Sequence, residues 1–185
     1  KRENKIEYAI VYCLTLSSVH MDALVSNKPR IFTSRFTNET LLQNREYRKR
    51  LGGWKGSLYG TPRRVKASLP LNRYMFVLEM NNDTNTTIGI GLVRNMVSCD
   101  RTYHVYNEGN YNRFIYKSKY RIDKEEMSRS EKALLEVFDV LLFKGRRHCK
   151  LSQGITEIGQ WIKDGPFDFV EYFKKIFNQR YTIEW

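Results

Sequence analysis

Two apolar segments, residues 73–80 and 87–93, lie on either side of the polar stretch NNDTNT. Both are rich in residues that favour β-strands, and such a polar stretch typically forms the turn between paired strands. We therefore predict a β-hairpin. In its second strand Gly89 and Gly91 share one face, where missing side chains allow a helix, another backbone or a ligand to come close. We expect a helix against that face.

Three further segments have the pattern of strands. Residues 8–16 are rich in β-branched and aromatic residues, which predicts a buried strand, and residues 31–36 predict another short strand. From 113 to 122 the pattern has a period of two. One face then holds Phe114, Tyr116, Tyr120 and Ile122, and the other holds Arg113, Lys117, Lys119 and Arg121. We interpret the cationic face as exposed, turned to solvent or to phosphates.

Two helices are predicted in the first third of the chain. Residues 18–29 form a short one. The next begins with Thr37 or Asn38 as its N-cap, because these side chains accept hydrogen bonds from the free N–H groups of a first turn. It ends before Gly52, where continuation becomes costly.

A glycine-rich segment, residues 52–70, follows this helix. Its glycines surround Trp54 and Tyr59, and the cations Arg63, Arg64 and Lys66 come directly after them. We expect a long flexible loop that displays these aromatic and basic side chains.

Two more helices are predicted near the C-terminus. Ser128 and Glu131 have the spacing of a capping box, and leucines recur after them at steps of three and four residues until about Gly145. The last helix begins after Gly165 with Pro166 as its first residue, and its aromatic stripe is typical of a helix that packs on a core.

These elements predict the α+β class. A chain of 185 residues with 41% hydrophobic residues suits one hydrophobic core. We expect a single compact domain over residues 1–185, with a mixed or antiparallel curved sheet or small barrel flanked by helices.

The net charge of the chain is the strongest indication of a binding partner. Lys and Arg number 32 against 20 Asp and Glu, which gives a formal net charge of +12 and a pI near 9.7. Such an excess indicates a polyanionic partner, and we expect nucleic acid, either RNA or DNA. No apolar run is long enough to cross a membrane and no signal peptide is visible, so we expect no membrane partner and an intracellular protein, nuclear or cytoplasmic.

Motifs for catalysis or metal binding are missing from the sequence. There is no phosphate-binding P-loop, no dinucleotide fingerprint, and no pair of cysteines or histidines at zinc-binding spacing. We therefore expect a non-catalytic protein without cofactor or metal. One alternative is an enzyme that depends on Cys149, whose pKa the neighbouring cations and His148 would lower.

The predicted nucleic-acid-binding residues combine three kinds of side chain. Arginine offers planar forks for phosphate oxygens, lysine offers point charge, and exposed aromatic rings stack on unpaired bases. Cations also gather after the third helix in the stretch FKGRRHCKLSQGI, which we interpret as a loop at the rim of a groove. The full set is Trp54, Lys55, Tyr59, Arg63, Arg64, Lys66, Arg113, Lys117, Lys119, Arg146, Arg147, His148, Lys150 and Gln153.

Residues 50–95 resemble PUA-like domains, including their YTH and EVE branches. The similarity rests on GGWKG, a basic loop and the hairpin RYMFVLEMNNDTNTTIGIGLV. It implies a domain around a curved sheet or small barrel that binds RNA or DNA, often with a modified or flipped base in an aromatic cage to which Trp54 would belong. Between Trp54 and Trp161 there is no tryptophan, whereas the YTH pattern has another cage tryptophan there, so general nucleic-acid binding is favoured over methyl-base reading.

A structural or assembly protein is the other alternative. In that case the basic face would dock on an acidic protein partner, and aromatic residues would form the interface of a homo-oligomer. Competition by short oligonucleotides separates this alternative from nucleic-acid binding.

Overall fold

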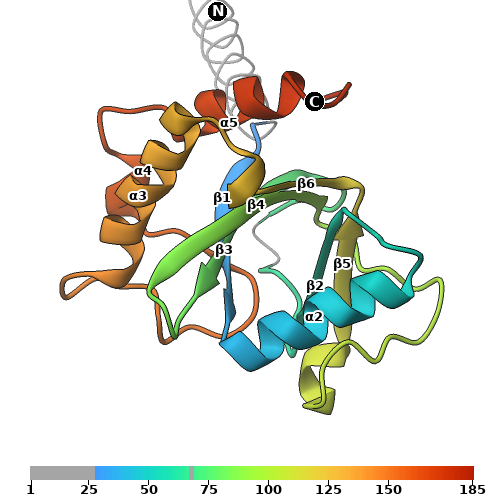
Figure 1. The fold of residues 1–185 in the computed structure, drawn as a ribbon. Coiled ribbons are helices and arrows are strands. Elements are labelled where there is room, and N and C mark those ends of the chain that lie inside the picture. Colours follow the sequence, from blue (N-terminus) through green and yellow to red (C-terminus); the bar gives the residue numbers. More distant parts are fainter. Residues whose placement is uncertain (1–27, 67–68) are drawn as a thin grey trace, which may run out of the picture.

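A five-stranded mixed sheet forms the centre of the structure, a computed structural model that describes residues 28–66 and 69–185 (Figure 1). Its strands, in spatial order, are β6 (Tyr120–Asp123), β4 (Thr86–Arg94), β3 (Tyr74–Asn81), β1 (Arg30–Phe36) and β7 (Thr156–Glu157). β1 runs parallel to β3, and the other neighbours are antiparallel. The predicted hairpin and the strand at 31–36 are confirmed. The predicted strand at 8–16 and almost all of the helix at 18–29 lie outside the described residues.

A second sheet pairs β2 (Ser57–Thr61) with β5 (Phe114–Ser118) in antiparallel orientation. Two predictions are therefore wrong. The segment expected as one long loop contains the fully buried strand β2, and the single strand expected at 113–122 divides at Lys119 into β5 and β6, which belong to different sheets.

Four α-helices lie within the described residues: α2 (Asn38–Arg50), α3 (Arg129–Phe143), α4 (Gln160–Lys163) and α5 (Phe169–Asn178). The predicted N-cap at Thr37 and the capping box from Ser128 to Glu131 are confirmed. α5 begins later than expected, because Asp168 is its N-cap and accepts a hydrogen bond from the backbone N–H of Glu171. None of these helices has the length and apolar character needed to cross a membrane. Two short 3-10 turns, η1 (Gly109–Asn112) and η2 (Lys124–Glu126), complete the elements.

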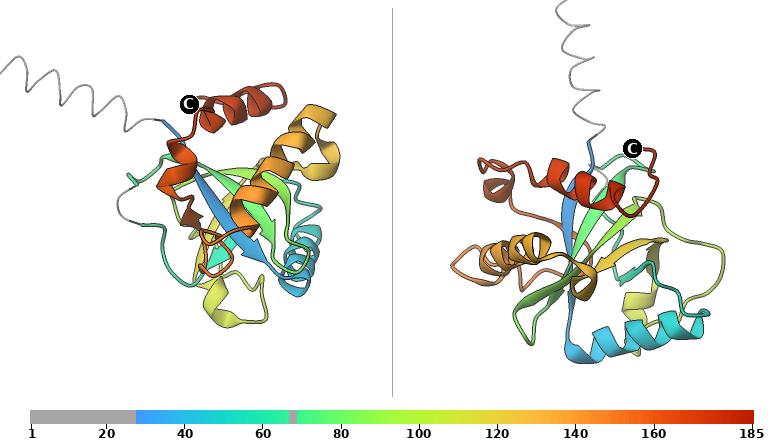
Figure 2. Two further views of the ribbon diagram at one scale, coloured as in Figure 1. Left: turned by 90° about the vertical axis from the view of Figure 1, so that its left-hand side faces the viewer. Right: turned by 45° about the horizontal axis from the view of Figure 1, so that its top comes forward.

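The two faces of the central sheet carry separate cores. α3 and α5 cover one face, and the two-stranded sheet with α2 covers the other, as the views in Figure 2 show. Phe76 and Leu135 belong to the first core, whereas Val77 and Leu58 belong to the second. For the described residues, the architecture is one α+β domain with a mixed sheet.

The glycine face of β4 packs on β2 rather than on a helix, which corrects the expectation for this face. A Cβ atom at Gly91 would overlap the hydroxyl of Tyr59 and the side chain of Ser57. The missing side chain thus allows the second sheet to approach, while α3 packs on the opposite face of β4.

A buried ionic group joins the two sheets. Tyr59 donates its hydroxyl hydrogen to Glu79 Oε1 at 2.7 Å, and Arg121 donates to both oxygens of Glu79, at 2.8 and 2.7 Å. Burial, followed by the charge of Glu79, raises the pKa of Tyr59 well above its usual value. Two sequence expectations are corrected here, because Tyr59 offers no exposed ring for stacking and Arg121 does not face solvent.

Candidate nucleic-acid interface

A pocket of about 350 Å³ opens where β1 ends and α2 begins. We name it the tyrosine pocket. Its lining comes from six parts of the chain: Ser34, Arg35 and Phe36 of β1, Thr37 and Thr40 at the start of α2, Gly60 of β2, Asn82, the two tyrosines Tyr106 and Tyr111, and residues 150–154.

The two tyrosines meet edge to face, with ring centroids 6.3 Å apart and planes at 72°. The side chain of Asn112 fixes the loop that carries them: it accepts hydrogen bonds from the backbone N–H of Val105 and Tyr106, at 2.9 and 3.0 Å, and donates to the carbonyl oxygen of Tyr106 at 2.7 Å. Asn44 of α2 donates to the Tyr106 hydroxyl at 3.0 Å. These bonds preorganise the aromatic wall.

Gly60 allows this wall to close on β2. A Cβ atom there would overlap the carbonyl oxygen of Tyr111 and lie 2.7 Å from the ring of Tyr106. Any side chain at position 60 must therefore displace the tyrosine loop.

Arg35 of β1 binds the segment of residues 149–154, which forms the wall opposite the tyrosines. Its guanidinium donates to the carbonyl oxygens of Cys149 and Gly154 and, at 2.9 Å, to the hydroxyl of Thr33. No carboxylate forms an ion pair with Arg35 among the described residues. Burial lowers its pKa to about 10, so it remains cationic at neutral pH. The pocket thus contains a positive charge without a counter-charge.

Lys150 connects this wall to the β3–β4 turn. Its ammonium group donates to Asn85 Oδ1 at 2.7 Å, and its carbonyl oxygen accepts from Asn82 Nδ2 at 3.2 Å. The loop of residues 150–154 is therefore fixed to the β3–β4 turn through both the side chain and the backbone of Lys150.

Three arginines gather beside the tyrosine pocket, and we name Arg63, Arg64 and Arg113 the arginine cluster. The pairing of Thr61 with Phe114 brings their two segments together, and the guanidinium groups of Arg64 and Arg113 lie 5.0 and 5.7 Å from the centre of the Phe114 ring. In residues 28–66 and 69–185 no carboxylate forms an ion pair with any of the three. A shallow hollow containing Arg63 and Arg113 shares Tyr111 and Gln153 with the tyrosine pocket.

The structure thus brings five of the predicted residues together: Arg63, Arg64, Arg113, Lys150 and Gln153. Trp54 and Lys55 lie at the opposite end of β2, together with the backbone of Lys119. Lys117 pairs with Asp100 at 2.8 Å. The remaining predicted residues, Lys66, Arg146, Arg147 and His148, are exposed and line neither hollow.

Sequence reasoning missed Arg35, Tyr106 and Tyr111. Only the stretch YNEGNY gave a local signal, as a turn between two tyrosines. Arg35 lies within a strand that the sequence predicts, but its contact with residues more than a hundred positions away leaves no local trace.

Cys149 does not have the environment of an activated nucleophile. Its side chain is half-buried, and burial raises the pKa of the thiol, whereas the enzyme alternative requires a lowered pKa. His148 beside it is exposed. Within the described part of the chain, no three side chains of His, Cys, Asp or Glu gather as metal ligands would.

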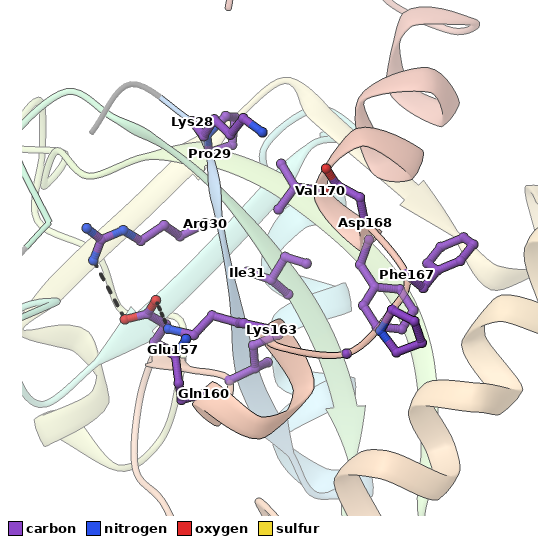
Figure 3. Close-up of a pocket in the computed structure, with 14 residues that line it drawn as sticks. Lys28, Pro29, Arg30, Ile31, Glu157, Gln160, Lys163, Phe167, Asp168 and Val170 are labelled. Atoms are coloured by element: carbon purple, nitrogen blue, oxygen red, sulfur yellow. Dashed lines mark hydrogen bonds and ion pairs between the residues drawn. The ribbon is translucent and has the colours of Figure 1, made fainter. Parts of the chain in front are cut away.

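Another pocket, of about 700 Å³, lies between the start of β1 and the α4–α5 connection (Figure 3). Two of its cations, Arg30 and Lys163, share the carboxylate of Glu157 as their ion-pair partner. None of the predicted binding residues lines it. Since Lys28, the first described residue, forms part of its wall, we assign no ligand to this pocket.

Comparisons with models of protein families, with curated proteins and with solved structures gave no match. The function must therefore be inferred from the geometry of the tyrosine pocket and the arginine cluster. The resemblance of residues 50–95 to PUA-like domains stays a prediction.

Proposed function

We propose that the protein binds nucleic acid, with one unpaired base in the tyrosine pocket and the neighbouring phosphates on the arginine cluster. The observation that carries this proposal is the shared border of the two features at Tyr111 and Gln153. A strand that places a base against the two tyrosines must run its phosphates over the adjacent surface. There Arg63, Arg64 and Arg113 have no ion pair among the described residues, and one carboxylate, Glu108, lines the same hollow.

The size of the pocket fits a small ligand group. Ligand pockets in proteins usually span about 300–1,000 Å³, and the tyrosine pocket, at about 350 Å³, lies at the lower limit. This volume suits one base and excludes a duplex. The bound nucleic acid is therefore single-stranded at this point, or its base is extruded from a duplex.

The positive charge around the pocket supports the same placement of the base and the phosphates. The guanidinium groups of the arginine cluster offer paired N–H donors to phosphate oxygens, and Arg35 and Lys150 add positive charge at the pocket itself. The resemblance to PUA-like domains agrees with a base pocket of this kind. It assigns the cage role to Trp54, however, and we give that role to Tyr106 and Tyr111 because Trp54 lies at the other end of β2.

The test is fluorescence anisotropy of the full chain with labelled single-stranded and duplex RNA and DNA over a series of salt concentrations. We expect single strands to bind best and the affinity to fall as salt rises. The double variant Arg63→Glu/Arg113→Glu should lose at least about tenfold in affinity, and Tyr111→Ala should lose about 1–3 kcal/mol of stacking.

The matched control is Arg129→Glu/Lys175→Glu, which makes the same change in net charge on exposed residues of α3 and α5. This control should bind nearly as the unmodified chain does. Equal losses of affinity in the two double variants would show that binding depends on net charge and not on the arginine cluster. Absent binding near physiological salt, together with a concentration-dependent oligomer, would support the assembly alternative instead.

A further inference from the structure

A second hollow, of about 680 Å³, lies at the far end of α2 from the tyrosine pocket. We name it the Arg48 pocket. α2 contributes Arg45, Arg48 and Lys49, and Trp54 and Lys55 follow from the connection to β2. With about 1.5 Å of rise per residue over 13 residues, α2 is roughly 20 Å long, and one hollow lies at each of its ends.

Arg48 is buried in this pocket without a carboxylate partner. Only 8% of its surface is exposed. Its Nε donates to Asn44 Oδ1 at 3.0 Å, and its Nη1 makes a long contact of 3.5 Å with the carbonyl oxygen of Gly56. No ion pair in the described residues includes Arg48.

The nearby carboxylates are already engaged by a different arginine. Glu79 and Asp123 both act on Arg48 through their charges, but each pairs with Arg121. Burial, together with the positive charge of Arg121, lowers the pKa of Arg48. A buried guanidinium that has no ion pair of its own is costly, and an anion beside it offsets that cost.

The rim of the pocket adds charge of the same sign. Arg45, Lys49 and Lys55 are exposed, and within the part of the chain that the structure describes none of them forms an ion pair. Three carboxylates also line the pocket: Asp123 pairs with Arg121 and acts through its charge on Arg45 and Arg48, Glu126 accepts a hydrogen bond from the backbone N–H of Asp123, and Glu125 is exposed. Cations therefore outnumber carboxylates around the opening.

We infer that the Arg48 pocket binds a phosphate group, with the guanidinium of Arg48 at its floor and the side chains of Arg45, Lys49 and Lys55 around it. Phosphate oxygens match the planar N–H fork of arginine and accept hydrogen bonds from several cations at once. The inference stands on residues that the tyrosine pocket does not use. The phosphate comes either from a small molecule or from the end of a nucleic-acid strand, and the two sources share this recognition.

The first experiment is isothermal titration calorimetry of the full chain with sodium phosphate, against sodium chloride at the same ionic strength. Saturable binding of phosphate is expected. The affinity should fall by about tenfold or more in Arg48→Gln, and by a similar factor in the exposed double variant Arg45→Glu/Lys49→Glu. This second variant keeps the test decisive if loss of the buried arginine impairs folding.

Arg50→Glu is the control, because Arg50 belongs to the same helix end but stacks on Tyr47 and does not line the pocket. It should bind phosphate like the unmodified chain. The inference is overturned by the absence of saturable binding, or by an equal loss of affinity in Arg50→Glu and in the variants of the pocket.

Oligonucleotides with a 5′-phosphate or a 5′-hydroxyl group then identify the source, and both are measured in the Arg63→Glu/Arg113→Glu background. Tighter binding of the phosphorylated strand, competed by inorganic phosphate, assigns the pocket to a strand end. Equal binding of the two strands, with saturable binding of phosphate retained, assigns it to a small phosphate-bearing molecule. Because this background already lacks the arginine cluster, failure of the proposed nucleic-acid site and failure of the Arg48 pocket give different results.

Discussion

The guanidinium of Arg121 and the carboxylate of Glu79 form a bidentate pair on the face of the five-stranded sheet that the two-stranded sheet covers, and each side chain is 2–3% exposed. Because both charges are removed from water, the pair is costly to break. The variant Glu79→Gln leaves Arg121 buried without its main counter-charge, and we expect a loss of about 3–5 kcal/mol in the free energy of unfolding.

Urea denaturation followed by circular dichroism measures this loss. Lys163→Gln, which removes one partner of the more exposed pair with Glu157, serves as the control and should cost less than about 1 kcal/mol. Replacement of both buried partners, Glu79→Leu/Arg121→Met, should recover much of the stability that Glu79→Gln loses. Similar costs for Glu79→Gln and Lys163→Gln would contradict a structural role for the buried pair.

Gly60→Ala should damage the tyrosine pocket selectively. The new methyl group overlaps the carbonyl oxygen of Tyr111, which belongs to the backbone and has no other place to go without movement of the loop. We expect a lower melting temperature and weaker binding of single-stranded nucleic acid. Gly109→Ala lies in the same region with open space around its Cβ and should leave both quantities unchanged; equal effects of the two variants would show that Gly60 has no special packing role.

Glu131 should make stability depend on pH at acidic values. Burial opposes its ionisation, but hydrogen bonds from Arg180 and from the backbone N–H of Ser128 outweigh burial and lower the pKa of Glu131. A carboxylate with a lowered folded-state pKa stabilises the fold above its ordinary pKa of about 4.3, and the contribution disappears as the pH falls through the folded-state value.

The variant Glu131→Gln should therefore cost about 1–3 kcal/mol at pH 7. Its difference from the unmodified chain should shrink steadily below about pH 4. Thermal or urea unfolding at several pH values measures this difference. A difference that stays constant down to pH 2 would mean that the ionised carboxylate is not the stabilising form.

Alkylation should distinguish the two described cysteines. Cys99 is exposed, whereas the Cys149 thiol is half-buried and burial raises its pKa, so less of it is the reactive thiolate at neutral pH. With iodoacetamide at pH 7, we expect peptides containing Cys99 to be labelled well before those containing Cys149. In urea the two rates should converge. Faster labelling of Cys149 in the folded protein would revive the alternative of a Cys149-dependent enzyme.

The elements that the sequence predicted are those with local signals. Thr37 and Ser128 cap their helices with their own side chains, and the hairpin is joined by a short polar turn, so neighbouring residues contain the information. β2 lacked such a signal, because its strand character depends on pairing with β5, whose partner residues are 53 to 61 positions away, and on the glycine face of β4. The division at Lys119 depends on the same long-range pairing.

The candidate site was predictable only in its charged half. Arg63, Arg64 and Arg113 were recognisable by residue type, although their proximity follows from the pairing of Thr61 with Phe114. The tyrosine pocket was not predicted, since aromatic residues are as common in cores as at sites. The exposure of Trp54 and Tyr59 was inferred from the surrounding glycines, of which Gly56 and Gly60 instead serve close packing.

Asn44 gives the fold a further property. Its amide nitrogen donates to the carbonyl oxygen of Leu58 and to the hydroxyl of Tyr106, and both bonds are lost if the helix slides along β2, whereas the bond that its oxygen accepts from Arg48 lies within α2. α2 therefore has one axial position. The spacing between the tyrosine pocket and the Arg48 pocket is then fixed by the fold, and under the proposed function a strand that reached both hollows would have to match that length.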